Sequence, residues 1–236
     1  LSPAVVRETR DAGASAIAVN DSKRVKVSGS GKRHPLQFLE RAILGVVSGM
    51  ELSCGSDSEL LAMLGASEGK DGAGFRGRWY GGDGIVLPMA SSVDQIRLAA
   101  SRLARACGHG GVSFAELACR VCDEGAFNDE VRKGALKSEI SFARVGALLR
   151  EVWDRHGGDA GLDEHGARVV VDRQGGRIGY SRQLERAIDG CEVGVVLEHP
   201  EASVYDLRGT GSGRGRRRRV TCAVGADGDH FPTALA

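Results

Sequence analysis

The strongest constraint on the fold is an uninterrupted apolar run in the last third of the chain, Arg168-Val-Val-Val171-Asp172. Three consecutive β-branched residues predict a buried strand, and the glycine-rich stretch up to Arg177 predicts a loop after it. A helical pattern follows over residues 181–188. The order strand, loop, helix is typical of an α/β domain, in which ligands bind at the carboxyl ends of the strands.

Further strands are expected on both sides of this unit. A short apolar run over 14–20 predicts a buried strand that leads into a charged loop. Three more runs predict strands at 191–197, 203–208 and 219–224. The last two are joined by residues 209–216, which are rich in glycine and arginine, so they predict a β-hairpin with a long basic tip.

The middle of the chain is mostly helical in pattern. Apolar residues recur at helical spacing over 36–47, 57–66, 92–107, 111–123 and 138–155. Residues 85–87 follow a glycine-rich loop and predict a short extended piece. We therefore predict one α/β domain over residues 1–236, with a mostly helical insertion at about 51–165.

Composition limits the class of protein. The chain has 236 residues, and its 32 Lys+Arg against 31 Asp+Glu neither require nor exclude a nucleic-acid partner. No apolar run approaches the roughly 18–20 residues of a membrane helix. Six dispersed cysteines and the absence of a signal-peptide pattern predict a reducing, cytoplasmic setting. Because residue 1 is Leu and the end is an apolar run, we expect a fragment of a longer protein.

Asp172 is the residue with the most specific indication of a catalytic or ligand-binding role. It follows a wholly apolar strand, and the glycines after it would let a substrate backbone come close. Arg173 and Arg177 flank it and favour an anionic partner. The alternative interpretation is an aspartate that only caps the following turn or helix, and position alone leaves both open.

Asp227 and Asp229 follow the last predicted strand and could supply further carboxylates near the first. Paired carboxylates suit Mg²⁺ or Mn²⁺, since hard cations prefer oxygen ligands and two such ions can assist phosphodiester hydrolysis. The Asp-Gly-Asp sequence is also common in solvated turns, which is the alternative.

Two clusters of basic residues are candidates for contact with phosphate groups. Arg214 and the run from Arg216 to Arg219 concentrate positive charge, although a solvated hairpin tip that discourages aggregation is an equal alternative. Ser22, Lys23 and Arg24 offer a hydroxyl, an ammonium and a guanidinium, which contact phosphates rather than bases.

Two other features of the sequence give weaker evidence of a functional site. Cys119-Arg-Val-Cys122 is a lone Cys-x-x-Cys, without a second pair at zinc spacing. The six histidines are scattered and support neither a zinc site nor a Ser/His/Asp triad.

Three segments, taken in chain order, resemble the ribonuclease HII-like branch of the ribonuclease H superfamily. Asp21-Ser-Lys-Arg-Val25 resembles the family's Asp-Ser-Lys-Lys-Leu motif, and Val171-Asp172 with its glycine-rich loop resembles the family's central strand end. Ala226-Asp227 with Phe231-Pro-Thr-Ala-Leu-Ala236 resembles the Ala-Asp…Tyr-Pro…Ala-Ala-Ala stretch of the last catalytic segment. The resemblance covers the two ends of the chain and leaves roughly 50–165 unmatched.

The resemblance implies a mixed sheet flanked by helices and metal-dependent hydrolysis of RNA in an RNA–DNA hybrid. Asp172 and Asp227 would be ligands of Mg²⁺ or Mn²⁺, and Ser22 and Lys23 would touch the nucleic-acid backbone.

The chain also departs from the family pattern. The family's opening Asp-Glu-Ala-Gly strand is missing from the first twenty residues, so two of its four carboxylates are absent here. The spacing from Asp227 to Pro232 is one residue longer than the family pattern, which leaves Asp229 as a rival ligand. We expect this fragment to be inactive by itself. The alternative function is a nucleic-acid-binding protein that keeps the sheet and the basic loops but performs no chemistry.

Overall fold

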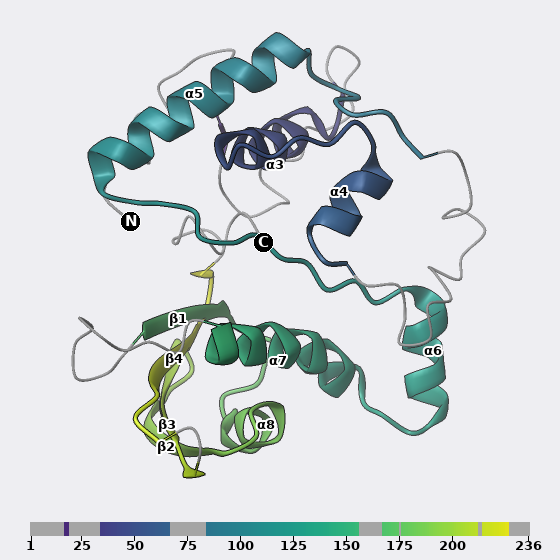
Figure 1. Cartoon of the computed structure of the whole chain (residues 1–236). Coiled ribbons are helices and arrows are strands. Elements are labelled where there is room, and N and C mark those ends of the chain that lie inside the picture. Colours follow the sequence, from purple (N-terminus) through teal and green to yellow (C-terminus); the bar gives the residue numbers. More distant parts are fainter. Residues whose placement is uncertain are drawn as a thin grey trace. The chain divides into compact units, whose positions relative to one another are not determined.

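The structure is a computed structural model that describes residues 17–18, 34–66, 84–155, 167–174, 176–211 and 214–226. The chain divides into two compact units (Figure 1). The helical unit includes the described residues 17–18, 34–65 and 84–118, and the sheet unit includes 66 and those from 119 to 226. No helix in these described ranges is long and apolar enough to cross a membrane.

The helical unit is built on two packed helices, α3 (Gln37–Gly49) and α5 (Val93–Gly110), with a short helix α4 (Asp57–Met63) between them in sequence. Its core consists of small and medium apolar side chains: Ile17, Ala42, Val46, Ala99, Leu103 and Cys107. The burial of Ile17 agrees with the expected apolar run, but residues 17–18 form no strand and the rest of 14–20 lies outside the described residues.

Local signals set the ends of α5. Ser92 and Gln95 form a reciprocal capping box at its start, which satisfies two backbone N–H groups that have no partner within the helix. Gly111 ends the helix with φ 63°, in the left-handed region that glycine adopts without strain. Before this helix, the Glu40 carboxylate of α3 accepts hydrogen bonds from the backbone N–H groups of Met89 and Ala90.

The helix expected over 111–123 is wrong. Residues 112–123 form neither helix nor strand, and the apolar residues Val112, Phe114 and Leu117 pack against the core of the helical unit. The next helix, α6 (Glu124–Arg132), begins where the expected one would end, because the Asp123 carboxylate caps it by accepting the Ala126 N–H at 2.6 Å.

The sheet unit continues from α6 with α7 (Lys137–Arg155), β1 (Ala167–Asp172), α8 (Ser181–Ala187), β2 (Cys191–Glu198), β3 (Ala202–Gly209) and β4 (Arg217–Ala223). The strands lie in the order β1-β4-β3-β2, with β1 parallel to β4 and the other pairs antiparallel. The four strands predicted after residue 167, the helix between the first two and the hairpin between the last two are therefore confirmed.

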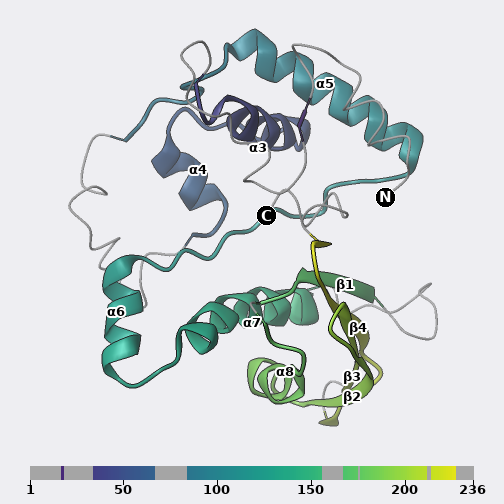
Figure 2. The same ribbon diagram turned by 180° about the vertical axis from the view of Figure 1, so that it is seen from behind.

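Helices α7 and α8 pack on the same face of this sheet (Figures 1 and 2). The core between them is rich in large side chains: Phe142, Leu149, Trp153, Tyr180, Leu184, Tyr205, Leu207 and Val220. The two helices approach closely at Gly146, where a Cβ atom would lie 2.8 Å from the Cβ of Ala187. The fold is α/β, with a mixed four-stranded sheet and helices beside it, as the sequence predicted.

Candidate functional site

Asp172 is the last residue of β1 and lies opposite Ala223 in the parallel register with β4. Since parallel strands end at the same edge of a sheet, the two carboxyl ends lie together. The Asp172 Oδ1 atom accepts a hydrogen bond from the Ala226 N–H at 3.1 Å. The partly buried carboxylate is thus anchored to the backbone that follows β4.

The turn after β4 is shaped to make that contact. Gly225 has φ 69°, a left-handed conformation that residues with a Cβ atom rarely adopt. The Val224 N–H donates to the Glu201 carbonyl oxygen at 2.9 Å, and Ala226 is buried. Asp227 is the next residue in the chain. It and Asp229 lie outside the described residues.

Arg173 organises the loop that follows Asp172. Its Nε donates to the Arg177 carbonyl at 2.8 Å and its Nη2 to the Gly176 carbonyl at 3.0 Å, while Nη1 donates to the Pro200 carbonyl. This guanidinium, predicted to contact nucleic acid, is therefore committed to three backbone carbonyls in this structure. Arg177 donates through Nη2 to the Ser138 hydroxyl on α7 at 3.1 Å and stays partly exposed.

Hydrogen bonds of two tyrosines hold the rest of this loop in place. The Tyr180 hydroxyl accepts the Gln174 N–H at 3.0 Å, and the Tyr180 N–H donates to the Tyr205 hydroxyl at 2.8 Å. The Tyr205 hydroxyl in turn donates to the Glu198 carboxylate at 2.6 Å. Beside them, the Ser203 hydroxyl donates to the Ile178 carbonyl at 2.7 Å. Because these bonds join the loop to β2 and β3, the backbone after Asp172 is held in one arrangement.

Burial governs the ionisation of this network. It raises the pKa of Tyr205 well above the ordinary value, and the hydrogen bond to Glu198 raises that pKa further. Burial also raises the pKa of Tyr180, and it raises the pKa of the neighbouring Cys222 thiol to about 12. All three groups are therefore neutral near pH 7.

The tyrosine network was not predicted, because the sequence gives only a weak indication of it. Tyr180 directly precedes a helix, and Tyr205 occupies a core position in the alternating pattern of β3. Nothing in the spacing of two residues 25 positions apart indicates a hydrogen bond between them.

The predicted basic residues are dispersed. Arg214 lies exposed at the tip of the β3–β4 hairpin, and Arg216 forms an ion pair with Asp154 of α7 at 3.5 Å. Ser22, Lys23 and Arg24 lie outside the described residues. The structure therefore places four of the seven predicted phosphate-contacting residues. Arg173 follows Asp172 directly in the chain, and the Arg177 guanidinium is directed to Ser138 of α7.

The chemistry of Asp172 suits a hard cation, since a carboxylate oxygen is the ligand that Mg²⁺ and Mn²⁺ prefer. Within the described part of the chain, no group of three or more His, Cys, Asp or Glu side chains gathers around a point that could hold a metal ion. The other two predicted ligands, Asp227 and Asp229, are not among those residues.

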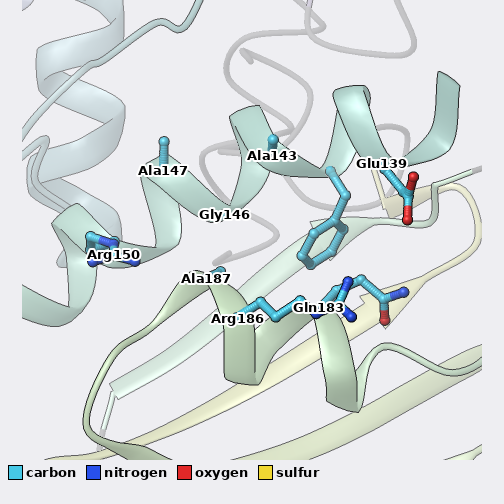
Figure 3. Close-up of a pocket in the computed structure, with 9 residues that line it drawn as sticks. Glu139, Ala143, Gly146, Ala147, Arg150, Gln183, Arg186 and Ala187 are labelled. Carbon is cyan, nitrogen blue, oxygen red and sulfur yellow. The ribbon is translucent and has the colours of Figure 1, made fainter. Parts of the chain in front are cut away.

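A separate groove runs between α7 and α8 (Figure 3). Its volume is about 420 Å³, and the small residues Ala143, Ala147 and Ala187 are among those that line it. Arg150 at one end is paired with Asp189 at 2.6 Å. The groove contains none of the residues predicted to be functional. Cys119 and Cys122 are free thiols that do not line this groove, and the Cys122 Sγ accepts a hydrogen bond from Arg144 at 3.1 Å.

A comparison of this chain with protein-family models, curated proteins and solved structures finds no match.

Proposed function

We propose that this chain is part of a divalent-metal-dependent endonuclease that hydrolyses the RNA strand of RNA–DNA hybrids, on a ribonuclease H-like sheet. The observation that carries the proposal is the hydrogen bond from the Ala226 N–H to Asp172, because it ties the carboxylate at the end of β1 to the residue before Asp227. This contact brings the Asp172 carboxylate to the backbone one residue before Asp227, which supports the proposal that these two carboxylates act together.

Each residue of the proposed site has its own role. Asp172 and Asp227, with Asp229 as a rival, would hold Mg²⁺ or Mn²⁺. The metal, when bound, supplies activation of water and neutralises charge on the phosphodiester. The Ala226 N–H orients the Asp172 carboxylate, and Arg173 holds the adjoining loop by its three carbonyl contacts. Ser22, Lys23 and Arg24 would contact the nucleic-acid backbone. The six free thiols support the predicted cytoplasmic setting.

The test uses the protein made from its complete open reading frame. We expect cleavage of a labelled RNA–DNA hybrid in Mg²⁺ or Mn²⁺, and we expect Asp172→Asn to lower the rate by about 10³-fold or more, since metal ions contribute several kcal/mol. Asp189→Asn is the matched control, because that carboxylate is exposed and pairs with Arg150. Undiminished cleavage by Asp172→Asn would remove Asp172 from the mechanism.

A nucleic-acid-binding protein without chemistry is the second candidate. The observation in its favour is the basic hairpin. Its second strand, β4, begins with three arginines, and a fourth, Arg216, directly precedes them. Tight binding of the hybrid, with no cleavage in either metal, would favour this candidate over the nuclease.

A further inference from the structure

The groove between α7 and α8 has the size of a site for a small organic molecule. Its volume of about 420 Å³ lies within the range of roughly 300–1,000 Å³ that such sites occupy. Figure 3 shows that residues of both helices border it. None of them belongs to the proposed nuclease site, so the groove has a lining of its own whose chemistry indicates what it could bind.

The two helices lie side by side and run in the same direction. Near their amino termini, the ring of Phe142 on α7 lies 5.7 Å from that of Tyr180, which directly precedes α8. Near their carboxyl termini, Arg150 of α7 pairs with Asp189, just after α8, at 2.6 Å. The groove therefore follows both helices, and each of them presents one face to it.

Much of the lining is apolar and in contact with water. Phe142 belongs to the core of the sheet unit and also lines the groove. One and two turns along α7, Ala143 is exposed and Ala147 is half-buried. Covering such a surface is favourable because it removes apolar area from water, and an aromatic ring in the lining suits a flat apolar body.

The α8 side of the groove carries polar groups. Gln183 and Arg186 are three residues apart on this helix, so they lie on the same face. Within the described ranges, neither side chain makes a hydrogen bond or an ion pair with another residue. A guanidinium and an amide NH₂ group are therefore both available to donate hydrogen bonds to a ligand in the groove.

The other charged residues of the lining favour an anion at Arg186. The charge of Arg150 at the carboxyl end is offset by its ion pair with Asp189. Glu139 lies at the amino end of α7, where its carboxylate accepts a hydrogen bond from the Leu136 N–H at 3.0 Å. That carboxylate repels a second anion, so the negative group of a ligand is directed to the arginine on α8.

The length of the α8 side favours a small molecule over a helix of another protein. Its lining residues span only 183–187, which is about 6 Å along the helix axis. A helical peptide is held in a groove by side chains at positions i to i+7, which extend over about 10 Å. The α8 side is therefore too short to contact all of these anchors.

We propose that the groove binds a small molecule with a flat apolar body and one anionic group, such as an aromatic carboxylate. The body covers Phe142, Ala143 and Ala147, and the anionic group accepts hydrogen bonds from Arg186 and Gln183. A guanidinium suits this role because it can donate two parallel hydrogen bonds to one carboxylate. The site shares no residue with the proposed nuclease site and does not depend on that function.

The test measures binding of 8-anilinonaphthalene-1-sulfonate, an aromatic anion whose fluorescence rises in apolar surroundings, to the protein made from its complete open reading frame. The double variant Ala143→Leu with Ala147→Leu should fill the groove and raise the Kd at least about tenfold. Leucine is a strong helix former and neither position is fully buried, so α7 should be retained. Arg186→Gln should raise the Kd about tenfold, since it removes a charged hydrogen-bond donor.

Controls separate the charge from the apolar contact. Arg182→Gln removes an exposed arginine of α8 that does not line the groove, and it should leave the Kd unchanged. N-phenyl-1-naphthylamine has similar rings without the sulfonate, so it should bind more weakly than the anion and be insensitive to Arg186→Gln. Circular dichroism checks that each variant is folded. If the leucine variant is not, Arg186→Gln with the two probes provides the second test.

Competition identifies the class of ligand. The aromatic carboxylate 2-naphthoate should displace the sulfonate probe, whereas an acidic amphipathic helical peptide should not. Displacement by the peptide alone would assign the groove to a protein partner and overturn the inference. It would also be overturned by absent binding of the sulfonate probe, by equal affinity for the neutral probe, or by an unchanged Kd in the folded groove variants. Failure of the wild-type protein to cleave a hybrid would overturn only the proposed function.

Discussion

The two units of this chain are stabilised in different ways. In the helical unit, α3 and α5 bury a core of small residues such as Ala42, Val46 and Ala99. In the sheet unit, strands distant in sequence bury large residues, and hydroxyl groups of Tyr180 and Tyr205 form a hydrogen-bonded network inside that core. The described residues of the candidate site, including Asp172 and Arg173, belong to the sheet unit. The comparison shows that the core of the sheet unit also carries the hydrogen bonds that hold the loop after Asp172.

The largest effect is expected from the cores themselves. Trp153→Ala should destabilise the sheet unit by about 3–5 kcal/mol, since it empties a large buried volume beneath Arg218. Leu103→Ala should destabilise the helical unit by about 2–5 kcal/mol. Hydrogen exchange followed by mass spectrometry would locate each effect, and we expect each to stay within its own unit. Faster exchange in α5 after Trp153→Ala would show that the units are not independent.

The next effect is alkaline destabilisation of the sheet unit. The pKa of Cys222 rises from an ordinary 9.0 to about 12 on folding, so the thiol must stay protonated in the core. Its contribution to stability is complete below pH 9 and is lost as pH rises toward 12, by up to about 4 kcal/mol. Urea unfolding at several pH values, followed by Trp153 fluorescence in a Trp79→Phe background, measures this slope. Cys222→Ala should reduce this slope and leave the part that comes from the raised pKa values of Tyr180 and Tyr205, whereas Cys107→Ala in the helical unit should leave the slope unchanged.

The smallest effect concerns the tyrosine network. Tyr205→Phe leaves the buried Tyr180 N–H without its acceptor and should lower the free energy of unfolding by about 1–3 kcal/mol. The Tyr180 amide should also exchange faster, because the loop after Asp172 loses an anchor. Ser101→Ala, which removes an exposed hydroxyl from α5, serves as the comparison and should leave both readings unchanged. A Tyr205→Phe protein with wild-type stability and exchange would mean that packing alone holds the loop.

Much of the sheet unit was predictable from short patterns. The β-branched run at Val169–Val171 and the alternation in 203–208 identify strands because each has one dominant period. The same use of periodicity gave a wrong prediction for the segment 111–123. Its apolar residues match a helical spacing, but the segment forms neither helix nor strand. Val112, Phe114 and Leu117 pack against the core of the helical unit, and Asp123 starts the helix later. Periodicity gives no information on which neighbour an apolar residue contacts.

The candidate site was only partly predictable. Asp172 followed from its place at a strand end, whereas the three carbonyl contacts of Arg173 did not, because a guanidinium beside glycines is equally suited to a phosphate. The parallel pairing of β1 with β4 could not be predicted either, because the paired residues are 51 positions apart in the sequence.

The Asp172–Ala226 hydrogen bond joins residues separated by 54 positions, and this separation bears on when the site forms. A chain emerging from the ribosome presents β1 first, but β4 can pair with it only after α8, β2 and β3 have been synthesised. Long-range parallel pairing is a slow step in folding, since the intervening loop must close before the contacts form. The Asp172 carboxylate therefore reaches its final position late, and a nascent chain that has not yet completed β4 lacks the contact with Ala226.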